Sequence, residues 1–454
     1  MPVSKMWDVA DAMVAEMRAG LFSNESGVSS LRMLVSPIDS FPTGNEEGTF
    51  YGVEMGRTKV CVFRAQLAGK ELGVAKKELM EVPVPINLMV GTSEELYHYL
   101  AAQLVKFIAS SGSTSVLGKP KEVGVAFSFP VIHSATEGIH VEWNKGFSIK
   151  ESAGRDALTM LNEAMVKHGV DMHIASLVNN TVGTLVGGRY CSHETVAAII
   201  LGNGTNAAYL EPLESVPKWH GSRPPHGQLV INMEWGDFLS SHLPVTEFDS
   251  QLDNESPRPG EQIFEKLISG MYLGDIVRRV LLKLAEETAL FGDSVPLKLR
   301  IPFALRTPDV ASMHQDTSSN LRVVAEKLDK ALGIHDTTRT MRKLVVEVCD
   351  AVTKRAARLA GAGIVGILKK LGRDGTDKKA VVVVEGGLYE HYRLFRTYLH
   401  SSIKEMLQGK FSDNVVIEHW PDVCGVGSAL LSVPSSHVCQ LGICAEANQC
   451  LGAE

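Results

Sequence analysis

The sequence has no long apolar stretch and no block of basic charge. Its longest uninterrupted apolar runs, such as Val196–Leu201 and Val381–Val384, are far too short to span a bilayer. The 45 basic and 52 acidic side chains are spread along the chain and give a formal net charge of −7. Because no stretch is basic enough to attract a phosphate backbone, we expect no nucleic-acid partner and no membrane span.

Cysteine is also sparse. The seven cysteines are odd in number and scattered, which makes a poor disulfide framework and suits a reducing compartment. Cys439, Cys444 and Cys450 cluster beside His437, but their spacing matches no common zinc pattern, and we expect no metal site built from side chains. The first residues hold no apolar core of signal-peptide type, so we expect a cytoplasmic protein, with nuclear or organelle-associated residence left open.

What the sequence does have is size and an ordinary globular composition. Its 454 residues exceed what one hydrophobic core usually supports, and 44% of them are hydrophobic against 21% charged. A strand–glycine turn–strand pattern at residues 49–66 recurs at residues 196–211. This repetition predicts an α/β protein of two related domains that face each other across a cleft.

Hydrophobic periodicity gives a coarse map of elements. It predicts helices at residues 7–21, 93–110, 152–168, 262–267, 273–291 and 340–371, with Gly361 and Gly363 interrupting the last. Runs rich in β-branched residues predict strands at residues 49–54, 60–66, 123–129, 173–178, 196–201, 207–211 and 380–384. Residues 245–261, which carry Pro257, Pro259 and Gly260, are expected to form a loop.

Three glycine-rich turns stand at strand ends. They are Gly56-Arg57-Thr58, Gly202–Asn206 and Gly386-Gly387. The second has the spacing of a dinucleotide fingerprint, but a strand follows it where a helix should begin, and the chain has no Walker A string. Residues without a β-carbon let backbone N–H groups approach an anion closely, so the three turns together predict binding of nucleotide phosphates.

Short polar side chains lie near these turns and at other strand or helix ends. A sugar requires several donors and acceptors at fixed angles, with aromatic or apolar walls that exclude water. Such a set is offered by Ser128, Phe129, Asn144, Lys145, Asn179, Asn180, Asn206, Glu234, Gln262 and Glu265. Singly, each is better explained as a helix cap or a surface polar group, and only their shared placement favours a binding site.

Five strings carry a resemblance to the hexokinase family, particularly to plant hexokinases and their hexokinase-like relatives. They are FSFP at 127–130, LVNNTVGT at 177–184, GTNAAYLE at 204–211, INMEWG at 231–236 and FEKLISGMYLGDIVR at 264–278. The likeness extends from about residue 7 to residue 433 and implies the two-domain hexokinase, or actin-like ATPase, fold with a ligand cleft between a small and a large domain. The small domain would span 48–179 with a C-terminal helix at 430–454, and the large domain 1–47 and 180–429.

The resemblance also implies roles for individual residues. Glucose or another hexose would contact Ser128, Phe129, Asn144, Lys145, Asn179, Asn206, Glu234, Gln262 and Glu265, of which only Asn144 departs from the family's usual Thr. ATP would contact Gly56, Arg57, Thr58, Lys59, Gly202, Asn203, Gly204, Thr205, Gly386 and Gly387. Magnesium would be held mainly through the nucleotide phosphates, and Lys145 would also assist catalysis.

The phosphate side departs from the family pattern. The first phosphate loop of the family reads Asp-x-Gly-Gly-Thr-Asn-Phe-Arg, whereas residues 54–61 read Glu-Met-Gly-Arg-Thr-Lys-Val-Cys. Arg57 therefore replaces a glycine that lets the backbone approach phosphate, and Cys61 replaces an arginine. In the second loop, Asn203 replaces a threonine.

The most consequential departure is Asn180. The family has an Asp there that takes the proton from the 6-hydroxyl of the sugar, and an amide cannot accept a proton at neutral pH. Loss of a positioned general base lowers the rate by about 10²–10⁴-fold, although phosphoryl transfer depends mainly on positioning and charge neutralisation, which leaves room for residual turnover.

We therefore expect a protein that binds glucose and ATP, transfers phosphate weakly or not at all, and acts as a sugar-responsive regulator. A regulatory role would bring protein partners. Two alternatives stay open: an ATP-dependent hexokinase of glycolysis with lowered activity or a substitute base, and a scaffold that binds neither ligand. The preserved sugar-side residues disfavour the scaffold.

Overall fold

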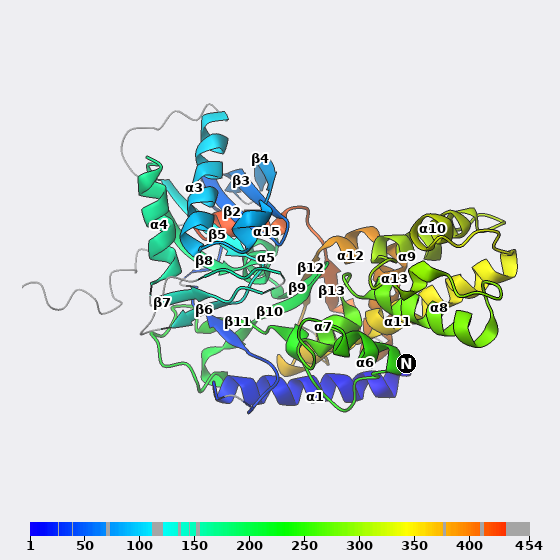
Figure 1. Ribbon diagram of the computed structural model, residues 1–454. Helices are drawn as coiled ribbons and strands as arrows, with labels where there is room; N and C mark the ends of the chain where they lie inside the picture. Colours follow the sequence, from blue (N-terminus) through cyan, green and yellow to red (C-terminus); the bar gives the residue numbers. More distant parts are fainter. Residues whose placement is uncertain are drawn as a thin grey trace, which may run out of the picture. The chain divides into compact units, whose positions relative to one another are not determined.

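The structure is a computed structural model of the chain (Figure 1). It describes residues 1–25, 27–38, 40–69, 73–110, 121–134, 138–144, 146–150, 155–375, 378–408 and 413–432. The chain divides into two compact units. The first comprises Met1–Met33, Val196–Ala207 and Met233–His419, and the second comprises Leu34–Thr195, Ala208–Asn232 and Trp420–Glu454.

A five-stranded sheet forms the centre of the second unit, in the order β4-β3-β2-β5-β8. Its strands are β2 (Glu47–Met55), β3 (Lys59–Ala68), β4 (Val74–Pro83), β5 (Lys121–Phe127) and β8 (Met172–Asn179). The first three run antiparallel, and β5 and β8 extend the sheet in parallel. The predicted hairpin is confirmed, and its turn is closed by a 2.9 Å hydrogen bond from Gly56 N–H to the Lys59 carbonyl.

Helices α3 (Ser93–Ser110) and α4 (Ala157–Lys167) share one apolar core with this sheet. The predicted start of α3 is confirmed, and a capping box formed by Thr92 and Glu95 explains it. The predicted start of α4 at residue 152 is wrong, because Asp156 accepts the N–H of Thr159 and begins the helix at Ala157. Residues 151–154 lie outside the described ranges.

Two further helices of the second unit, α5 (Asn180–Cys191) and α15 (Val423–Leu430), pack against the sheet and each other at very short range. A β-carbon on Gly124 would lie 1.8 Å from the Ser428 carbonyl oxygen, and one on Gly427 would lie 1.8 Å from the Gly183 carbonyl oxygen. Only glycine permits this approach. This close approach places α15 against the first turn of α5, which begins with Asn180.

The smaller elements of the second unit surround this core. They are η1 (Ile86–Met89), β6 (Val131–Ser134), β7 (Gly138–Val141) and η2 (Leu213–Ser215), and β6 and β7 form a two-stranded antiparallel sheet. Of the predicted C-terminal segment 430–454, residues 433–454, with Cys439, Cys444 and Cys450, lie outside the described ranges.

A six-stranded sheet has the order β1-β11-β10-β9-β12-β13. The first unit contains most of β9 (Thr195–Leu201), the start of β10 (Thr205–Pro212), β12 (Ala380–Glu385) and β13 (Val415–Glu418). The rest of β10 pairs antiparallel with β11 (Gln228–Asn232), which pairs antiparallel with β1 (Leu34–Ser36) in the second unit. The predicted strands at 196–201, 207–211 and 380–384 are thus confirmed.

Helices make up the rest of the first unit. They are α1 (Val3–Phe22), η3 (Trp235–Asp237), α6 (Glu247–Asn254), α7 (Ile263–Ile268), α8 (Leu273–Thr288), η4 (Leu297–Arg300), α9 (Thr307–His314), α10 (Arg322–Leu332), α11 (Arg339–Lys370), α12 (Gly387–His391) and α13 (Arg393–Leu407). Helix α6 lies where a loop was predicted, and that prediction is wrong. The Thr246–Asp249 capping box begins the helix, and it ends before the prolines.

Helix α11 is continuous, so the predicted interruption at Gly361 and Gly363 is wrong. A β-carbon on Gly361 would lie 2.1 Å from Ser402 Oγ, and one on Gly363 would lie 2.9 Å from the Trp235 ring. These glycines are needed for close packing and do not break the helix. Among the described residues, no helix combines the length and apolarity needed to cross a membrane.

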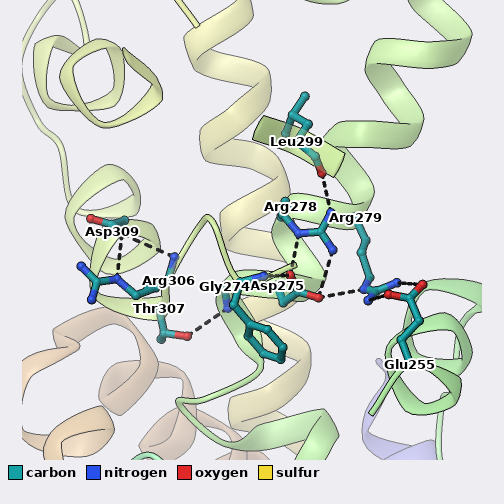
Figure 2. Close-up of polar contacts among 10 residues, drawn as sticks. Glu255, Gly274, Asp275, Arg278, Arg279, Leu299, Arg306, Thr307 and Asp309 are labelled. Carbon is teal, nitrogen blue, oxygen red and sulfur yellow. Dashed lines mark hydrogen bonds and ion pairs between the residues drawn. The ribbon is translucent and has the colours of Figure 1, made fainter. Parts of the chain in front are cut away.

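A buried ionic network anchors α8 (Figure 2). The fully buried Asp275 carboxylate accepts hydrogen bonds from Arg278 Nε at 2.5 Å, Arg279 Nε at 2.8 Å and the Phe303 N–H at 2.7 Å. Arg279 also forms an ion pair with Glu255 at 2.7 Å. Burial opposes ionisation of Asp275, but the hydrogen bonds from Arg278 and Phe303 outweigh it and hold the pKa of this carboxyl below its ordinary value.

Candidate functional site

Three of the predicted sugar residues meet in the first unit. Asn206, at the start of β10, donates from Nδ2 to Glu234 Oε1 at 3.0 Å, and Glu265 Oε2 accepts the N–H of Thr205 at 2.9 Å. All three side chains are buried. We call Asn206, Glu234 and Glu265 the Asn206 cluster.

Local backbone geometry positions this cluster. Glu234 (φ 51°) and Gln262 (φ 54°) adopt the left-handed conformation immediately before η3 and α7. Such residues persist where the surrounding structure holds them, often at binding sites. A β-carbon on Gly236 would lie 3.1 Å from Glu265 Cβ, so glycine allows α7 to approach η3. Gln262 therefore begins the helix that carries Glu265.

Asp237 adds a titratable group that the sequence reasoning missed. Burial, together with the nearby charges of Glu234 and Glu265 and against the opposing charge of Arg32, raises the pKa of its carboxyl to about 7. The only available signal was its place directly after the Ile231–Gly236 string. The Asn206 cluster is thus accompanied by a carboxyl that changes its charge near neutral pH.

Two of the three predicted glycine turns come together in the same unit. A β-carbon on Gly386, whose φ is +115°, would lie 2.5 Å from the Leu201 carbonyl oxygen and 2.9 Å from Gly202 N. Gly270 N–H donates to the Gly202 carbonyl at 2.8 Å, and a β-carbon on Gly270 would lie 2.7 Å from that oxygen. Gly270 was not predicted as part of this turn, although it lies inside the 264–278 string.

The other residues of the second turn are held by backbone and hydroxyl contacts. The exposed Asn203 accepts the N–H of Met271 on its carbonyl at 3.0 Å. The Thr205 hydroxyl donates to the Ile200 carbonyl at 2.9 Å and accepts from the indole of Trp235 at 2.8 Å. Gly204 accepts the N–H of Gly202 at 3.0 Å, which closes the turn between β9 and β10.

A second cluster lies in the second unit around Asn180. Asn180 Nδ2 donates to Ser128 Oγ at 3.0 Å, and the Cys424 thiol lies 3.4 Å from the Asn180 carbonyl oxygen. Glu54, at the end of β2, lies near enough to Asn180 and Cys424 for both side chains to lower the pKa of its carboxyl. We call Asn180, Ser128, Glu54 and Cys424 the Asn180 cluster; Glu54 and Cys424 were not predicted as site residues.

Glu54 has unusual electrostatics for a half-buried carboxyl. Burial is the largest influence and raises its pKa, against the lowering effect of the Cys424 and Asn180 side chains and of the Lys59 charge. Asp422 adds to the rise. The net result is a carboxyl with a pKa above its ordinary value, near the Asn180 side chain.

The predicted first phosphate turn, Gly56-Arg57-Thr58, joins β2 to β3. Arg57 is not among the non-glycine residues with positive φ, so the hairpin turn is made without the left-handed backbone that a glycine supplies. A terminal nitrogen of its guanidinium would lie 3.9 Å from a β-carbon on Gly146. Thr58 is exposed and accepts the Val84 N–H on its carbonyl at 2.9 Å.

Charges near this turn are already partnered. The Lys59 ammonium pairs with Glu81, whose hydrogen bond raises the lysine pKa. The Cys61 thiol lies 3.6 Å from the same carboxylate, and burial, reinforced by the charge of Glu54, raises its pKa to about 12. Cys61 is therefore a neutral thiol where the family pattern has a cation.

Asn179 and Phe129 have clear structural roles. Asn179 caps α5 by accepting the Thr181 N–H at 2.9 Å, and its Nδ2 donates to the Phe129 carbonyl at 2.9 Å. The Phe129 ring is fully buried, with centroids 5.1 Å from Trp143 and 4.8 Å from Phe147. This aromatic cluster fixes the end of the segment that carries Ser128.

Asn144 and Lys145 complete the predicted set. The Asn144 Oδ1 atom is buried and has no hydrogen-bond partner among the residues that the structure describes. Lys145, predicted both as a sugar contact and as a catalytic residue, lies outside the described ranges. Within those ranges, no group of three or more His, Cys, Asp or Glu side chains is arranged to hold a metal ion.

Comparison with known proteins decides the family. A family model described as hexokinase matches residues 1–190, and a second model of the same description matches residues 196–433. The chain belongs to the hexokinase family. Hexokinase-1 of Spinacia oleracea is 51% identical over 442 residues, which cover 96% of this chain and 88% of the relative. Hexokinase-1 of Arabidopsis thaliana is also 51% identical over 442 residues, with 96% and 89% coverage.

Solved structures agree with the family assignment. The hexokinase from Schistosoma mansoni complexed with glucose is 30% identical, with a TM-score of 0.83 and 95% of each chain covered. The predicted α/β, two-domain hexokinase fold is therefore confirmed.

Proposed function

We propose that this hexokinase-family chain binds glucose or another hexose, uses Mg-ATP as its phosphate donor, and transfers the γ-phosphoryl group to the sugar only weakly. Its main role would be that of a sugar-responsive regulator. The observation that carries this proposal is a contrast between two clusters: the Asn206 cluster keeps the residue types of the family, whereas the Asn180 cluster has an amide where the family has its base.

Support for hexose binding comes from the supply of buried hydrogen-bonding groups. Glu234 and Glu265 are both buried; Glu234 accepts a hydrogen bond from the Asn206 amide, and Glu265 accepts one from the Thr205 backbone N–H. Buried polar atoms are normally hydrogen-bonded, so the Asn144 Oδ1 atom is suited to accept a sugar hydroxyl. A solved hexokinase that covers 95% of this chain is complexed with glucose.

Support for nucleotide binding comes from the contact between the turns at Gly202 and Gly386. A side chain at Gly386 has no room, so the backbone itself forms this surface, as phosphate binding requires. The magnesium ion would be held mainly by the phosphates of ATP, where it would neutralise charge during transfer. Arg57 and the Glu81-bound Lys59 supply positive charge on the altered first turn.

Weak catalysis follows from the chemistry of residue 180. The Asn180 Nδ2 atom donates to Ser128, so this side chain acts as a hydrogen-bond donor where a proton acceptor is needed. Ligand contacts made only in one conformation shift the population toward it, and hexose binding without turnover is suited to such signalling. We place this role in the cytoplasm, with protein partners that respond to the sugar-bound state.

Hexose binding and phosphoryl transfer are separable in one experiment. The purified chain is titrated with glucose while its thermal unfolding is followed, and glucose 6-phosphate formation with Mg-ATP is measured on the same sample. A ligand that binds only the native state raises its stability. We expect a rise in Tm at millimolar glucose together with turnover at least about 10²-fold below an ordinary hexokinase. Absence of any thermal shift would contradict the proposal.

One observation favours a second candidate, an active ATP-dependent hexokinase of glycolysis and hexose metabolism. Glu54 places a carboxyl of raised pKa near Asn180, so the cluster retains a group able to accept a proton. Turnover of the wild-type chain within about tenfold of an ordinary hexokinase would select this candidate over weak transfer, because loss of a positioned base lowers rates by more than that.

A further inference from the structure

The ammonium group of Lys266 is buried and donates to three acceptors of one short segment. Lys266 belongs to α7, and its side chain is 7% exposed. Its Nζ atom donates to Asp253 Oδ1 at 2.5 Å, to the Arg258 carbonyl at 2.8 Å and to the Glu261 carbonyl at 2.8 Å. Because a lysine ammonium has three donors and no acceptor, these bonds use its full hydrogen-bonding capacity. The ammonium is thus committed to the segment between the end of α6 and the start of α7.

The segment that Lys266 holds is an exposed connection. Residues 255–261 join α6 to α7, and all of them except the half-buried Ser256 are exposed. Two of them are prolines, which have no N–H to donate. The Gly260 N–H donates to Asp253 Oδ2 at 2.9 Å, so the Asp253 carboxylate receives both this N–H and the Lys266 ammonium. Asp253 and Lys266 therefore fix the connection from its two ends.

The connection ends at Gln262, a predicted hexose contact. Gln262 directly follows Glu261 and adopts the left-handed conformation, with φ 54° and ψ 41°. Its carbonyl accepts the backbone N–H of Lys266 at 3.0 Å. Lys266 therefore binds the chain on both sides of the Gln262 Cα atom: its ammonium binds the preceding carbonyl, and its N–H binds the carbonyl of Gln262 itself. A left-handed residue other than glycine persists only where the surrounding structure holds it.

We infer that Lys266 is a positioning residue for hexose binding, and that it acts by holding the backbone of Gln262 in its left-handed conformation. This inference rests on the proposed function, in which Gln262 contacts the sugar. Glu265 has a separate anchor, because its Oε2 atom accepts the Thr205 N–H at 2.9 Å. Loss of the Lys266 ammonium should therefore disturb Gln262 more than Glu265, and hexose binding more than nucleotide binding.

A role in stability alone would give a different result. Lys266 and Asp253 form a largely buried ion pair, and removal of one partner of such a pair lowers the stability of the fold. Lower stability by itself leaves the affinity of the folded protein for glucose unchanged. A positioning role lowers that affinity, because a binding-competent conformation that is only partly populated reduces the apparent affinity by its population.

The experiment is a double-mutant cycle on the full chain, at a temperature where each variant is folded. Lys266→Met, Gln262→Ala and the double variant are compared with the wild type for glucose affinity by calorimetry and for ATP affinity by fluorescence titration with a nucleotide analogue. Lys330→Met on α10, which breaks an exposed ion pair with Glu326, is the matched control. Hydrogen exchange of the Gly260 N–H reports on the connection without any ligand.

We expect Lys266→Met to lower glucose affinity at least about tenfold, as a binding-competent Gln262 backbone populated in about a tenth of the molecules would require. In the Gln262→Ala background the same change should cost less than about threefold, because the residue through which Lys266 acts has lost its side chain. ATP affinity should change less than about twofold. The Gly260 N–H should exchange faster in Lys266→Met than in the wild type, and Lys330→Met should match the wild type throughout.

Glucose affinity of Lys266→Met equal to that of the wild type, or equal losses in both backgrounds, would overturn the inference. If Lys266→Met does not fold, Lys266→Arg decides, because it keeps the charge beside Asp253 but replaces the ammonium with a planar fork. It should lower glucose affinity at least about threefold, and unchanged affinity would overturn the inference. Failure of the proposed function looks different, because the wild type itself would then not bind glucose.

Discussion

Asn206 Nδ2 donates a 3.0 Å hydrogen bond to Glu234 Oε1, and both side chains are buried. The Glu234 backbone is left-handed, a conformation that costs about 1–3 kcal/mol and is maintained only by its surroundings. The pair is thus built without a ligand: the Asn206 amide holds one carboxylate oxygen of Glu234.

This relationship gives a first prediction. Asn206→Ala should lower hexose affinity at least about tenfold, because it removes the hydrogen bond to Glu234, and a hydrogen bond to a charged group contributes about 1.5–3 kcal/mol. Calorimetric titration with glucose measures the effect. Asn254→Ala, at the exposed end of α6, is the control and should bind like the wild type. Equal affinities for the two variants would remove Asn206 from the site.

A second prediction concerns Asp237, whose pKa rises from 3.8 to about 7 on burial. Between these values the carboxyl is protonated in the folded chain and ionised in the unfolded chain, so the free energy of unfolding falls as the pH rises through this window. Above this pH window, the stabilisation by the protonated Asp237 is lost completely. Asp237→Asn should therefore be more stable than the wild type at pH 8 and equal to it at pH 3, as measured by urea unfolding. A variant less stable at pH 8 would contradict the assigned burial effect.

The Asp275 network gives a third prediction. Asp275→Asn leaves Arg278 and Arg279 buried without their shared carboxylate and should lower the free energy of unfolding by about 3–5 kcal/mol. Asp293→Asn is the control, because Asp293 is exposed after α8 and its loss should change stability by less than about 0.5 kcal/mol. Urea unfolding of both variants is the measurement. A decrease of less than about 1 kcal/mol in the free energy of unfolding for Asp275→Asn would mean that the ionic network contributes little to stability.

A fourth prediction tests the contact between the two glycine turns. Gly386→Ala should lower ATP affinity at least about tenfold, because the new methyl group would lie 2.5 Å from the Leu201 carbonyl oxygen and because φ is +115° there. Gly375→Ala, which meets nothing within 4 Å, should bind ATP normally. Fluorescence titration with a nucleotide analogue compares them. Normal nucleotide binding by Gly386→Ala would exclude this turn from the phosphate site.

Patterns of hydrophobicity predicted much of the fold. The hairpin of β2 and β3 and the helices α3 and α11 follow directly from periodicity and from caps such as Thr92. Errors arose where tertiary packing overrides local propensity: Gly361 and Gly363 are poor helix formers, yet α11 continues through them because Ser402 and Trp235 need the space. Helix α6 was missed because prolines beyond its end obscured the capping box at Thr246.

The recognisable strings contain residues that the structure brings together, but they do not reveal residues that the fold brings in from elsewhere. Asn206, Glu234 and Glu265 come from separate strings and meet in one cluster. Glu54 and Cys424 are far apart in the sequence, and only the glycine-dependent approach of α15 brings Cys424 to Asn180. The raised pKa values of Glu54 and Asp237 arise from burial, which no local pattern reveals.

We propose that residue 180 limits phosphoryl transfer while hexose binding is preserved. The most direct test is kcat for glucose 6-phosphate formation by Asn180→Asp and the wild type, measured side by side at saturating glucose and ATP. We expect an increase of about 10²-fold or more for Asn180→Asp, with unchanged glucose affinity. A wild type that turns over as fast as the Asn180→Asp variant would contradict it.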